Sequence, residues 1–293
     1  MTELDLERMV LVGGTGRSGS TIVGHLLDHH PDLTLTRPME VRFIAGASGL
    51  ADALAVSRKS PGSDKAHAAA ELAVDRLLNR WFYRAEHVGL HESMAKDDVE
   101  GWAADYLAEF EDDAAAASRR LSDRIMERIA LRLGATRLVD TTPANARKAD
   151  RLEPIYPASK VVMVKRDGRD VSASFVSQAF GPDDVFEALD QWERRMLASD
   201  KAARASRPDR ILQFELVDLV VRRREETLAI LCSFLNVPVD TGMREWFDAN
   251  VTSDGMHPGR WRRDFDEETC ARIDQHYAAA CERLSAAGIA VPA

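Results

Sequence analysis

The sequence predicts an α/β fold with three layers, in which a central parallel sheet is flanked by helices and carries a large helical insertion. Three observations support this prediction. Short apolar segments typical of buried strands alternate with segments of helical periodicity, as in sheets built with crossover helices. A glycine-rich turn joins the first strand to the first helix. A long alanine-rich, charged stretch with apolar residues at helical spacing separates the early elements from the later strands.

The expected elements follow in order along the chain. The first strand is expected at 9–12, an apolar run that ends in two glycines. The next helix is expected at 21–30, because apolar residues recur there at helical spacing and Pro31 closes the segment. Residues 51–133 are expected to form the helical insertion. Further strands are expected at 137–140, 160–165 and 210–214, and the last helix at 266–287.

The composition is that of a globular protein. Of the 293 residues, 45% are hydrophobic and 30% are charged, which excludes collagen-like, disulfide-scaffold and wholly disordered proteins. The length alone leaves one or two domains open. We interpret residues 1–293 as a single domain, because strand signals resume after the insertion.

Charge and cysteine content limit the expected partners and location. The 39 Lys and Arg against 48 Asp and Glu give a net charge of −9, which argues against nucleic acid as a partner. The three cysteines lack metal-ligand spacing, so neither a metal site nor a disulfide framework is expected. The acidic N-terminus differs from a signal peptide, and no run approaches the roughly 20 apolar residues that span a bilayer. We therefore expect a cytoplasmic protein without a transmembrane segment.

The glycine-rich turn has the spacing of a phosphate-binding P-loop, whose backbone N–H groups and following helix form an anion site. The usual lysine of that pattern is replaced by Ser20, and the only cation in the turn is Arg17. A nucleoside triphosphate with magnesium therefore fits poorly. The alternative is a flexible turn that merely connects strand and helix. The candidate nucleotide-binding residues are Gly14, Thr15, Gly16, Arg17, Ser18, Gly19, Ser20 and Thr21.

A second cluster, KRDGRDVSAS at 165–174, follows the strand expected at 160–165. Arg166 stands at the end of that strand, and Ser174 lies one to two turns into the next helix. Both are expected to address one anion, because ligands of open α/β sheets bind outside the carboxyl ends of the strands. The alternative is a solvated turn with local ion pairs.

Together these segments resemble the sulfotransferase family that uses 3′-phosphoadenosine 5′-phosphosulfate (PAPS). GTGRSGST resembles the family's loop for the 5′-phosphosulfate, and VKRDGRDVSASF resembles its 3′-phosphate motif. Gly259-Arg260-Trp261 resembles the element that bacterial and Golgi-type members, such as tyrosyl-protein and carbohydrate sulfotransferases, close over the nucleotide. The resemblance runs from residue 10 to about 265. It implies a P-loop-like fold, PAPS as the co-substrate without a metal, and Arg260 on the nucleotide phosphates.

The resemblance also implies catalytic roles. Arg17 would stabilise the leaving phosphate. Residues 36–43, TRPMEVRF, resemble the segment where tyrosyl-protein sulfotransferases carry a catalytic glutamate, which assigns the general base to Glu40 and an acceptor contact to Arg42. The alternative for this pair is an ordinary ion pair on a strand edge. His25, His29 and His30 offer competing bases, although surface or capping roles are favoured for them.

One departure from the family concerns the acceptor side. Many relatives carry a lysine that touches the transferred sulfate where this chain has Thr141. Either the threonine contributes a hydrogen bond, or a cation such as Arg37, Arg147 or Lys148 replaces the lysine. Asn145 is expected to line the acceptor side or to begin a helix.

The function that these residues favour is transfer of a sulfuryl group from PAPS to a hydroxyl of a small-molecule, sugar or lipid acceptor. Two alternatives stay open. A non-catalytic nucleotide-binding module is favoured by Thr141, and a P-loop kinase that uses ATP is opposed by the missing lysine.

Overall fold

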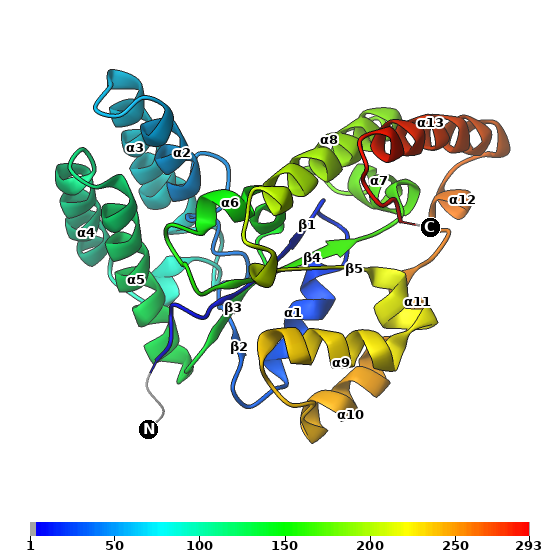
Figure 1. Ribbon diagram of the computed structural model, residues 1–293, viewed down its shortest axis with the longest axis horizontal. Coiled ribbons are helices and arrows are strands. Elements are labelled where there is room, and N and C mark those ends of the chain that lie inside the picture. Colours follow the sequence, from blue (N-terminus) through cyan, green and yellow to red (C-terminus); the bar gives the residue numbers. More distant parts are fainter. Residues whose placement is uncertain (1–3, 293) are drawn as a thin grey trace.

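The computed structural model describes residues 4–292 and contains a five-stranded, all-parallel sheet with the strand order β2-β3-β1-β4-β5 (Figure 1). The α/β class with a central parallel sheet is therefore confirmed. The short edge strand β2 carried no strand signal in the sequence, because two residues are too few to show alternation. The strands are β1 (Val10–Gly14), β2 (Thr34–Leu35), β3 (Leu138–Asp140), β4 (Lys160–Lys165) and β5 (Ile211–Glu215).

Alternation of side chains along the strands divides the core between the two faces of the sheet. Val10 and Val12 of β1 belong to one buried cluster, whereas Leu11 belongs to another. On β4, Val162 and Val164 join the first cluster, while Val161 and Met163 join the second. Both faces are covered, which is why these strands are apolar at successive positions.

One face is covered by α1, α9 and α10, which lie below the sheet in Figure 1, and the other by η3, α6 and α8. These elements are α1 (Ser20–Asp28), α9 (Arg224–Leu235), α10 (Thr241–Asn250), the 3₁₀ helix η3 (Pro143–Lys148), α6 (Ala149–Leu152) and α8 (Val185–Arg204).

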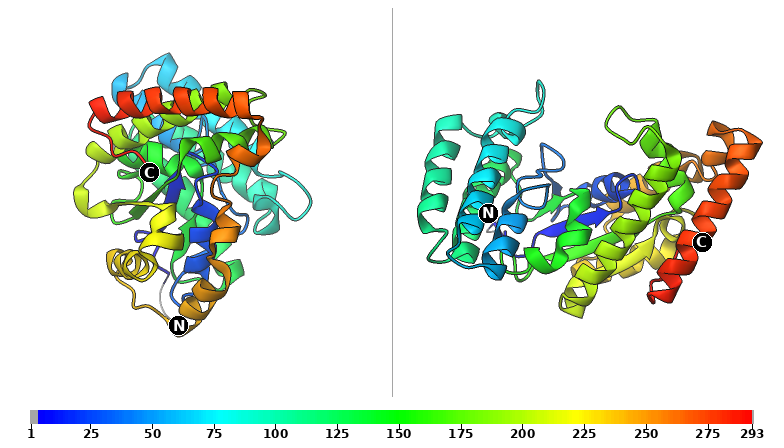
Figure 2. Two further views of the ribbon diagram at one scale, coloured as in Figure 1. Left: turned by 90° about the vertical axis from the view of Figure 1, so that its right-hand side faces the viewer. Right: turned by 90° about the horizontal axis from the view of Figure 1, so that it is seen from above.

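The segment expected as an insertion is helical and extends the core on the face of Leu11. Figure 2 shows its helices at one end of the molecule and α13 at the other. Side chains cap several helices, as when Ser63 accepts a hydrogen bond from the Ala66 N–H. The elements of this segment are α2 (Leu50–Lys59), α3 (Asp64–Arg76), the π-helical turn η1 (Leu77–Trp81), the 3₁₀ turn η2 (Leu90–Glu92), α4 (Lys96–Glu109) and α5 (Ala114–Leu133).

The C-terminal helices pack on α7 and α8 and form a third apolar cluster. The helix expected at 266–287 is α13, and its stripe buries Ile273, Tyr277 and Leu284. None of the helices of residues 4–292 combines the length and the apolar run needed to cross a membrane. The remaining elements are α7 (Gly168–Val176), η4 (Pro208–Arg210), η5 (Asp218–Arg222), α11 (Ser253–Met256), α12 (Trp261–Asp264) and α13 (Glu267–Ala286).

Candidate active site

The candidate site lies where the carboxyl ends of β1 and β4 meet. The chain leaves β1 toward β2 and leaves β4 toward β5, so these neighbouring strands form the switch point at which open α/β sheets bind ligands. A cavity of about 610 Å³ opens there. This volume lies within the range of about 300–1,000 Å³ that is usual for small-molecule sites.

The glycine-rich turn forms the floor of the cavity. Gly16, Arg17 and Gly19 all have positive φ, and α1 begins directly after them at Ser20. A Cβ at Gly19, where φ is +103°, would meet Leu216 at 2.7 Å, so both the backbone angle and the close approach require glycine. The cavity is lined by Gly16, Arg17, Gly19, Ser20 and Thr21, whereas Gly14, Thr15 and Ser18 are buried behind them.

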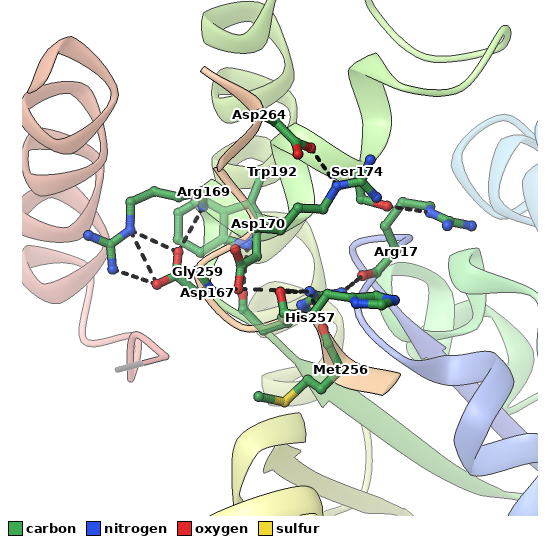
Figure 3. A network of polar contacts seen from close by, with 12 residues as sticks. Arg17, Asp167, Arg169, Asp170, Ser174, Trp192, Met256, His257, Gly259 and Asp264 are labelled. Carbon is green, nitrogen blue, oxygen red and sulfur yellow. Dashed lines mark hydrogen bonds and ion pairs between the residues drawn. The ribbon is translucent and has the colours of Figure 1, made fainter. Parts of the chain in front are cut away.

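The two sequence clusters meet at Arg17. Its Nε donates a hydrogen bond to Ser174 Oγ at 3.0 Å, and Arg166 Nη1 donates to the Arg17 carbonyl oxygen at 3.2 Å. Figure 3 shows Arg17 and Ser174 side by side in this network. The Nε of Arg166 is buried and has no partner within residues 4–292. Arg17 and Arg166, expected at the two ends of a nucleotide, therefore line the same cavity, whereas Ser174 is buried and reaches it through its bond to Arg17.

Arg166 and Asp170 also hold residues 256–259, and Figure 3 shows Asp170 beside Gly259. Arg166 Nη2 donates to the Met256 carbonyl oxygen at 2.7 Å, and Asp170 Oδ2 accepts from the Gly259 N–H at 3.1 Å. Burial raises the pKa of Asp170, although the nearby Arg166 opposes this shift. Motif residues thus fix residues 256–259 beside the cavity.

Arg260 and Trp261 take structural contacts in this arrangement. Arg260 Nε donates to Asp264 Oδ2 at 2.6 Å, and the cavity wall is formed instead by Arg17 and Arg166. Trp261 is buried, and the Arg169 guanidinium lies 5.0 Å from its ring centroid. The alternative interpretation of the second cluster as local ion pairs holds for Arg169 with Asp167 and in part for Arg166, whose Nη2 lies 3.8 Å from Asp170 Oδ2. Arg166 differs in that it also lines the cavity.

The segment after β2 brings Glu40 and Arg42 to the cavity wall. Arg42 Nε donates to Glu40 Oε2 at 3.0 Å, so the two side chains do form the ion pair considered as the alternative, although it lies at the cavity rather than on a strand edge. Both residues have positive φ, at 55° and 59°. Arg84, from the insertion, donates to the carbonyl oxygens of Met39 and Glu40 at 3.0 Å each. Such strained backbone persists only where its surroundings hold it.

Asp140, at the end of β3, organises this wall. Its side chain accepts hydrogen bonds from the Val41 N–H at 3.1 Å and from the Thr142 N–H at 3.2 Å. The Asn145 amide donates to the same carboxylate at 2.8 Å, and the Thr142 hydroxyl at 3.1 Å. Burial raises the pKa of Asp140, and these donors partly offset the shift. The carboxylate therefore holds Val41, in the middle of the Glu40–Arg42 turn, to the segment that follows β3.

Thr141 and Asn145 lie behind the cavity surface. Both are 1% exposed. A Cβ at Gly24 would meet Thr141 Cγ2 at 2.4 Å, which places this methyl group against α1. Asn145 Nδ2 also donates to the Val12 carbonyl oxygen at 3.2 Å, so its amide ties η3 to β1. Thr142, and not Thr141, forms the cavity wall here.

The three cations considered as replacements for the family lysine differ in position. Arg37 pairs with Asp28 at 2.9 Å, and Lys148 pairs with Asp52 at 2.7 Å. Only Arg147 of these three lines the cavity.

Of the three candidate histidine bases, His25 lines the cavity. His29 stacks on Trp246 with ring centroids 4.7 Å apart, and His30 is buried. His25 therefore stays a competitor to Glu40.

Sequence reasoning missed several residues of the site. Asp140 ends a predicted strand, which is a position where polar side chains gather at one sheet edge. Arg84 comes from the turn between η1 and η2 and Arg195 from α8, both distant in sequence, and no local pattern marks them. Arg195 and Gln191 lie one turn apart on α8, and Phe180 lies in the preceding loop; all three line the cavity.

Within residues 4–292 no group of three or more His, Cys, Asp or Glu side chains is arranged to hold a metal ion. The arginines are the charged groups that face the cavity, with Glu40 as their acidic neighbour. The arrangement is suited to binding anions beside one carboxylate.

Comparisons with known proteins agree with this chemistry. A model of the sulfotransferase family matches residues 10–241. A sulfotransferase domain from the olefin synthase of Synechococcus PCC 7002 superposes with a TM-score of 0.54 at 16% identity, covering 97% of this chain and 96% of that one. A sulfotransferase domain from the curacin biosynthetic pathway gives 0.53 at 16% identity, covering 97% and 99%. A sulfotransferase from Mycobacterium avium gives 0.51 at 15% identity, covering 98% and 78%. A search of curated proteins found no match.

Proposed function

This chain belongs to the sulfotransferase family, and we propose that it transfers a sulfuryl group from PAPS to a hydroxyl of a small-molecule, sugar or lipid acceptor, releasing adenosine 3′,5′-bisphosphate (PAP). The observation that carries the proposal is the hydrogen bond between Arg17 of the glycine-rich turn and Ser174 of the second cluster. A donor with phosphates at both ends would need these two groups beside one cavity.

The residues present fit PAPS. The turn and the N-terminus of α1 offer backbone N–H groups to the 5′ end of the donor. Arg166, whose buried Nε lacks a partner within residues 4–292, and Ser174 would hold the 3′-phosphate. On the β5 side the cavity is lined by apolar side chains suited to an adenine ring: Ile22, Leu216, Val220, Val251 and Met256. The cavity volume of about 610 Å³ is in the range of small-molecule sites.

In the proposed reaction PAPS supplies an activated sulfuryl group. The bond between sulfur and the bridging oxygen of the 5′-phosphate breaks, and that oxygen keeps the electron pair. Arg17, the amides of the turn and the hydroxyls of Ser20 and Thr21 would stabilise the developing charge, because preorganised donors favour the transition state. A sulfuryl group carries less negative charge than a phosphoryl group, so arginine side chains and backbone amides can supply the charge neutralisation that its transfer needs.

Glu40 would act as the general base. The acceptor oxygen forms the new bond to sulfur, and its proton passes to the Glu40 carboxylate. Arg42 orients this carboxylate through Oε2, which leaves Oε1 toward the acceptor. The Asp140 network would keep the base at a fixed position relative to Arg17.

The decisive experiment compares two nucleotides by titration calorimetry. PAP should bind, whereas ATP with magnesium should bind weakly, because the lysine of the triphosphate pattern is replaced by Ser20. Tight binding of ATP without a response to PAP would favour the kinase.

A second experiment tests transfer: radiolabelled PAPS is incubated with hydroxylated compounds, and labelled product is measured. PAP binding without any transfer would instead favour the non-catalytic module.

A further inference from the structure

Two arginines of the cavity wall take no part in the proposed reaction as written above: Arg195, and Arg147, which was considered only as a replacement for the family lysine. Arg147 lies on η3 and Arg195 on α8, and these two elements pack against each other. Both side chains line the cavity. Arg195 Nη1 donates to the Thr15 carbonyl oxygen at 2.5 Å, and its guanidinium lies 5.0 Å from the centroid of the Phe175 ring. Neither arginine forms an ion pair with a carboxylate within residues 4–292.

This lack of a partner is unusual for the region. Lys148 and Arg151, which neighbour Arg147 in sequence, both pair with Asp52 at 2.7 Å. Arg42, on the same wall, pairs with Glu40. Lys148, Arg151 and Arg42 are thus paired with carboxylates. Arg147 and Arg195 form no such ion pair within residues 4–292, although Asp52 is near enough to Arg147 to oppose the lowering of its pKa.

Keeping both charges there has a free-energy cost. Burial lowers the pKa of Arg147, and burial together with the repulsion from Arg147 lowers the pKa of Arg195 to about 10. At neutral pH both still carry their charge. Two half-buried like charges beside one cavity are favourable only when an anion compensates them.

The position of the pair indicates which anion this is. η3 follows β3, and Glu40 follows β2, so the sheet order puts Arg147 on the side of the predicted base. The apolar lining suited to adenine follows β5, at the opposite edge. In the proposed reaction the donor's phosphates already have Arg17 and Arg166.

We propose that Arg147 and Arg195 bind an anionic group of the acceptor, which is therefore a hydroxylated molecule that carries a carboxylate or a phosphate. This inference rests on the proposed function, which makes this half of the cavity the acceptor side. Arginine forks bind both kinds of oxyanion through paired hydrogen bonds. Gln191, one turn before Arg195, adds a neutral polar group, and Phe175 and Phe180 offer apolar contacts to the rest of the acceptor.

The test uses protein saturated with PAP, so that the nucleotide site is filled before a probe is added. The probes share one hydroxylated ring and differ in charge: 4-hydroxybenzoate, 4-hydroxybenzylphosphonate and the neutral 4-hydroxybenzamide. At least one anionic probe should bind about tenfold more tightly than the amide, as expected for a charge-assisted hydrogen bond. The tighter of the two anions then identifies the carboxylate or the phosphate as the recognised group.

Variants assign the preference to the two arginines. In Arg147→Gln, Arg195→Gln and the double variant, the preference for the anion should fall by about tenfold while PAP affinity is kept. Arg147→Lys and Arg195→Lys should retain part of the preference for the anion, because lysine keeps the positive charge. Arg194→Gln is the matched control, because Arg194 is the exposed neighbour on α8 and lies outside the cavity wall.

Three outcomes can be distinguished. Failure of PAP to bind the wild-type protein would count against the proposed function itself. PAP binding without any preference for an anion over the amide would overturn the inference about the acceptor and leave the donor site standing. A preference that survives in a folded double variant would also overturn it.

Discussion

Arg17 and Ser174 are 157 residues apart in sequence, yet Arg17 Nε donates a hydrogen bond to Ser174 Oγ at 3.0 Å. The bond joins the turn after β1 to the helix after β4. It aligns the guanidinium along the floor of the cavity and leaves its two terminal nitrogens for a ligand.

Replacing Ser174 tests this alignment. Ser174→Ala should weaken PAP binding by about tenfold, because both the orientation of Arg17 and one hydroxyl donor are lost. Calorimetric titration of PAP measures the change. Ser177→Ala is the control, since Ser177 follows the last residue of the same helix. Its hydroxyl donates to the Ser174 carbonyl oxygen and accepts from Gln178, and neither bond involves Arg17. Equal affinity in wild type and Ser174→Ala would contradict the role.

Replacing Arg17 tests stabilisation of the leaving group. Arg17→Ala should reduce PAPS turnover by about a thousandfold, which abolishes it in practice, because a preorganised donor at the developing charge is removed. PAP affinity should fall far less than turnover. Arg17→Lys keeps the charge without the hydrogen bond to Ser174 and should be intermediate. An Arg17→Ala protein with normal turnover would remove Arg17 from the mechanism.

Replacing Glu40 separates the two candidate bases. Glu40→Gln should lower kcat by about a hundredfold or more while PAP affinity stays unchanged, because only proton removal from the acceptor is affected. The exposed Glu86→Gln serves as the control. If Glu40→Gln stays active and His25→Asn does not, the base is the histidine that lines the same cavity.

Replacing Asp140 tests the network behind the base. In Asp140→Asn one oxygen becomes an amide nitrogen that cannot accept hydrogen bonds from Val41 or Thr142, so the Glu40 turn loses a support. We expect kcat to fall by about tenfold with PAP affinity unchanged. Asp150→Asn, on α6, is the control. An unchanged kcat would show that the turn holds its shape without this carboxylate.

The pH dependence of stability provides a second test of Asp140. Burial raises the pKa of Asp140 above its ordinary value of 3.8, so the folded protein holds this proton more tightly than the unfolded chain does. The contribution of Asp140 to the free energy of unfolding is therefore complete below pH 3.8, and it is lost as the pH rises through the raised pKa of the folded state. The asparagine side chain of Asp140→Asn does not titrate, so this variant lacks the pH-dependent contribution. The unfolding free energy of the wild type should therefore fall relative to that of Asp140→Asn as the pH is raised, measured by urea unfolding. The opposite trend would contradict the direction of the shift.

Replacing Asp170 tests the attachment of residues 256–259. Asp170→Ala removes the acceptor of the Gly259 N–H, so this segment should be cleaved faster in limited proteolysis. PAP should slow the cleavage by binding beside Arg166. The exposed Asp183→Ala is the matched control. Equal cleavage rates in all three proteins would show that Asp170 does not hold the segment.

The sequence allowed the parallel sheet and its long helices to be predicted, because apolar runs and helical periodicity are local properties. The glycine-rich turn and the Arg166–Ser174 spacing were recognisable for the same reason. The two-residue strand β2 was not, since its pairing depends on β3 more than 100 residues later.

The same limit applies to the site. Arg195 reaches the cavity only because α8 packs on η3, and Arg84 contacts the backbone of the Glu40 turn only because the insertion folds back over it. The departure at Thr141 was visible in the sequence, but the cation that faces the cavity near it could be chosen only once Arg37 and Lys148 were seen to be paired elsewhere.

The attachment of residues 256–259 has a consequence for how this protein can change over evolution. Arg166 and Asp170 bind the carbonyl oxygen of Met256 and the N–H of Gly259, and both groups belong to the backbone. The φ of +67° at Gly259 favours glycine at that position, whereas the side chain of residue 256 is not read by Arg166. Selection for this attachment would therefore act on Arg166, Asp170 and Gly259 more than on the side chain at position 256.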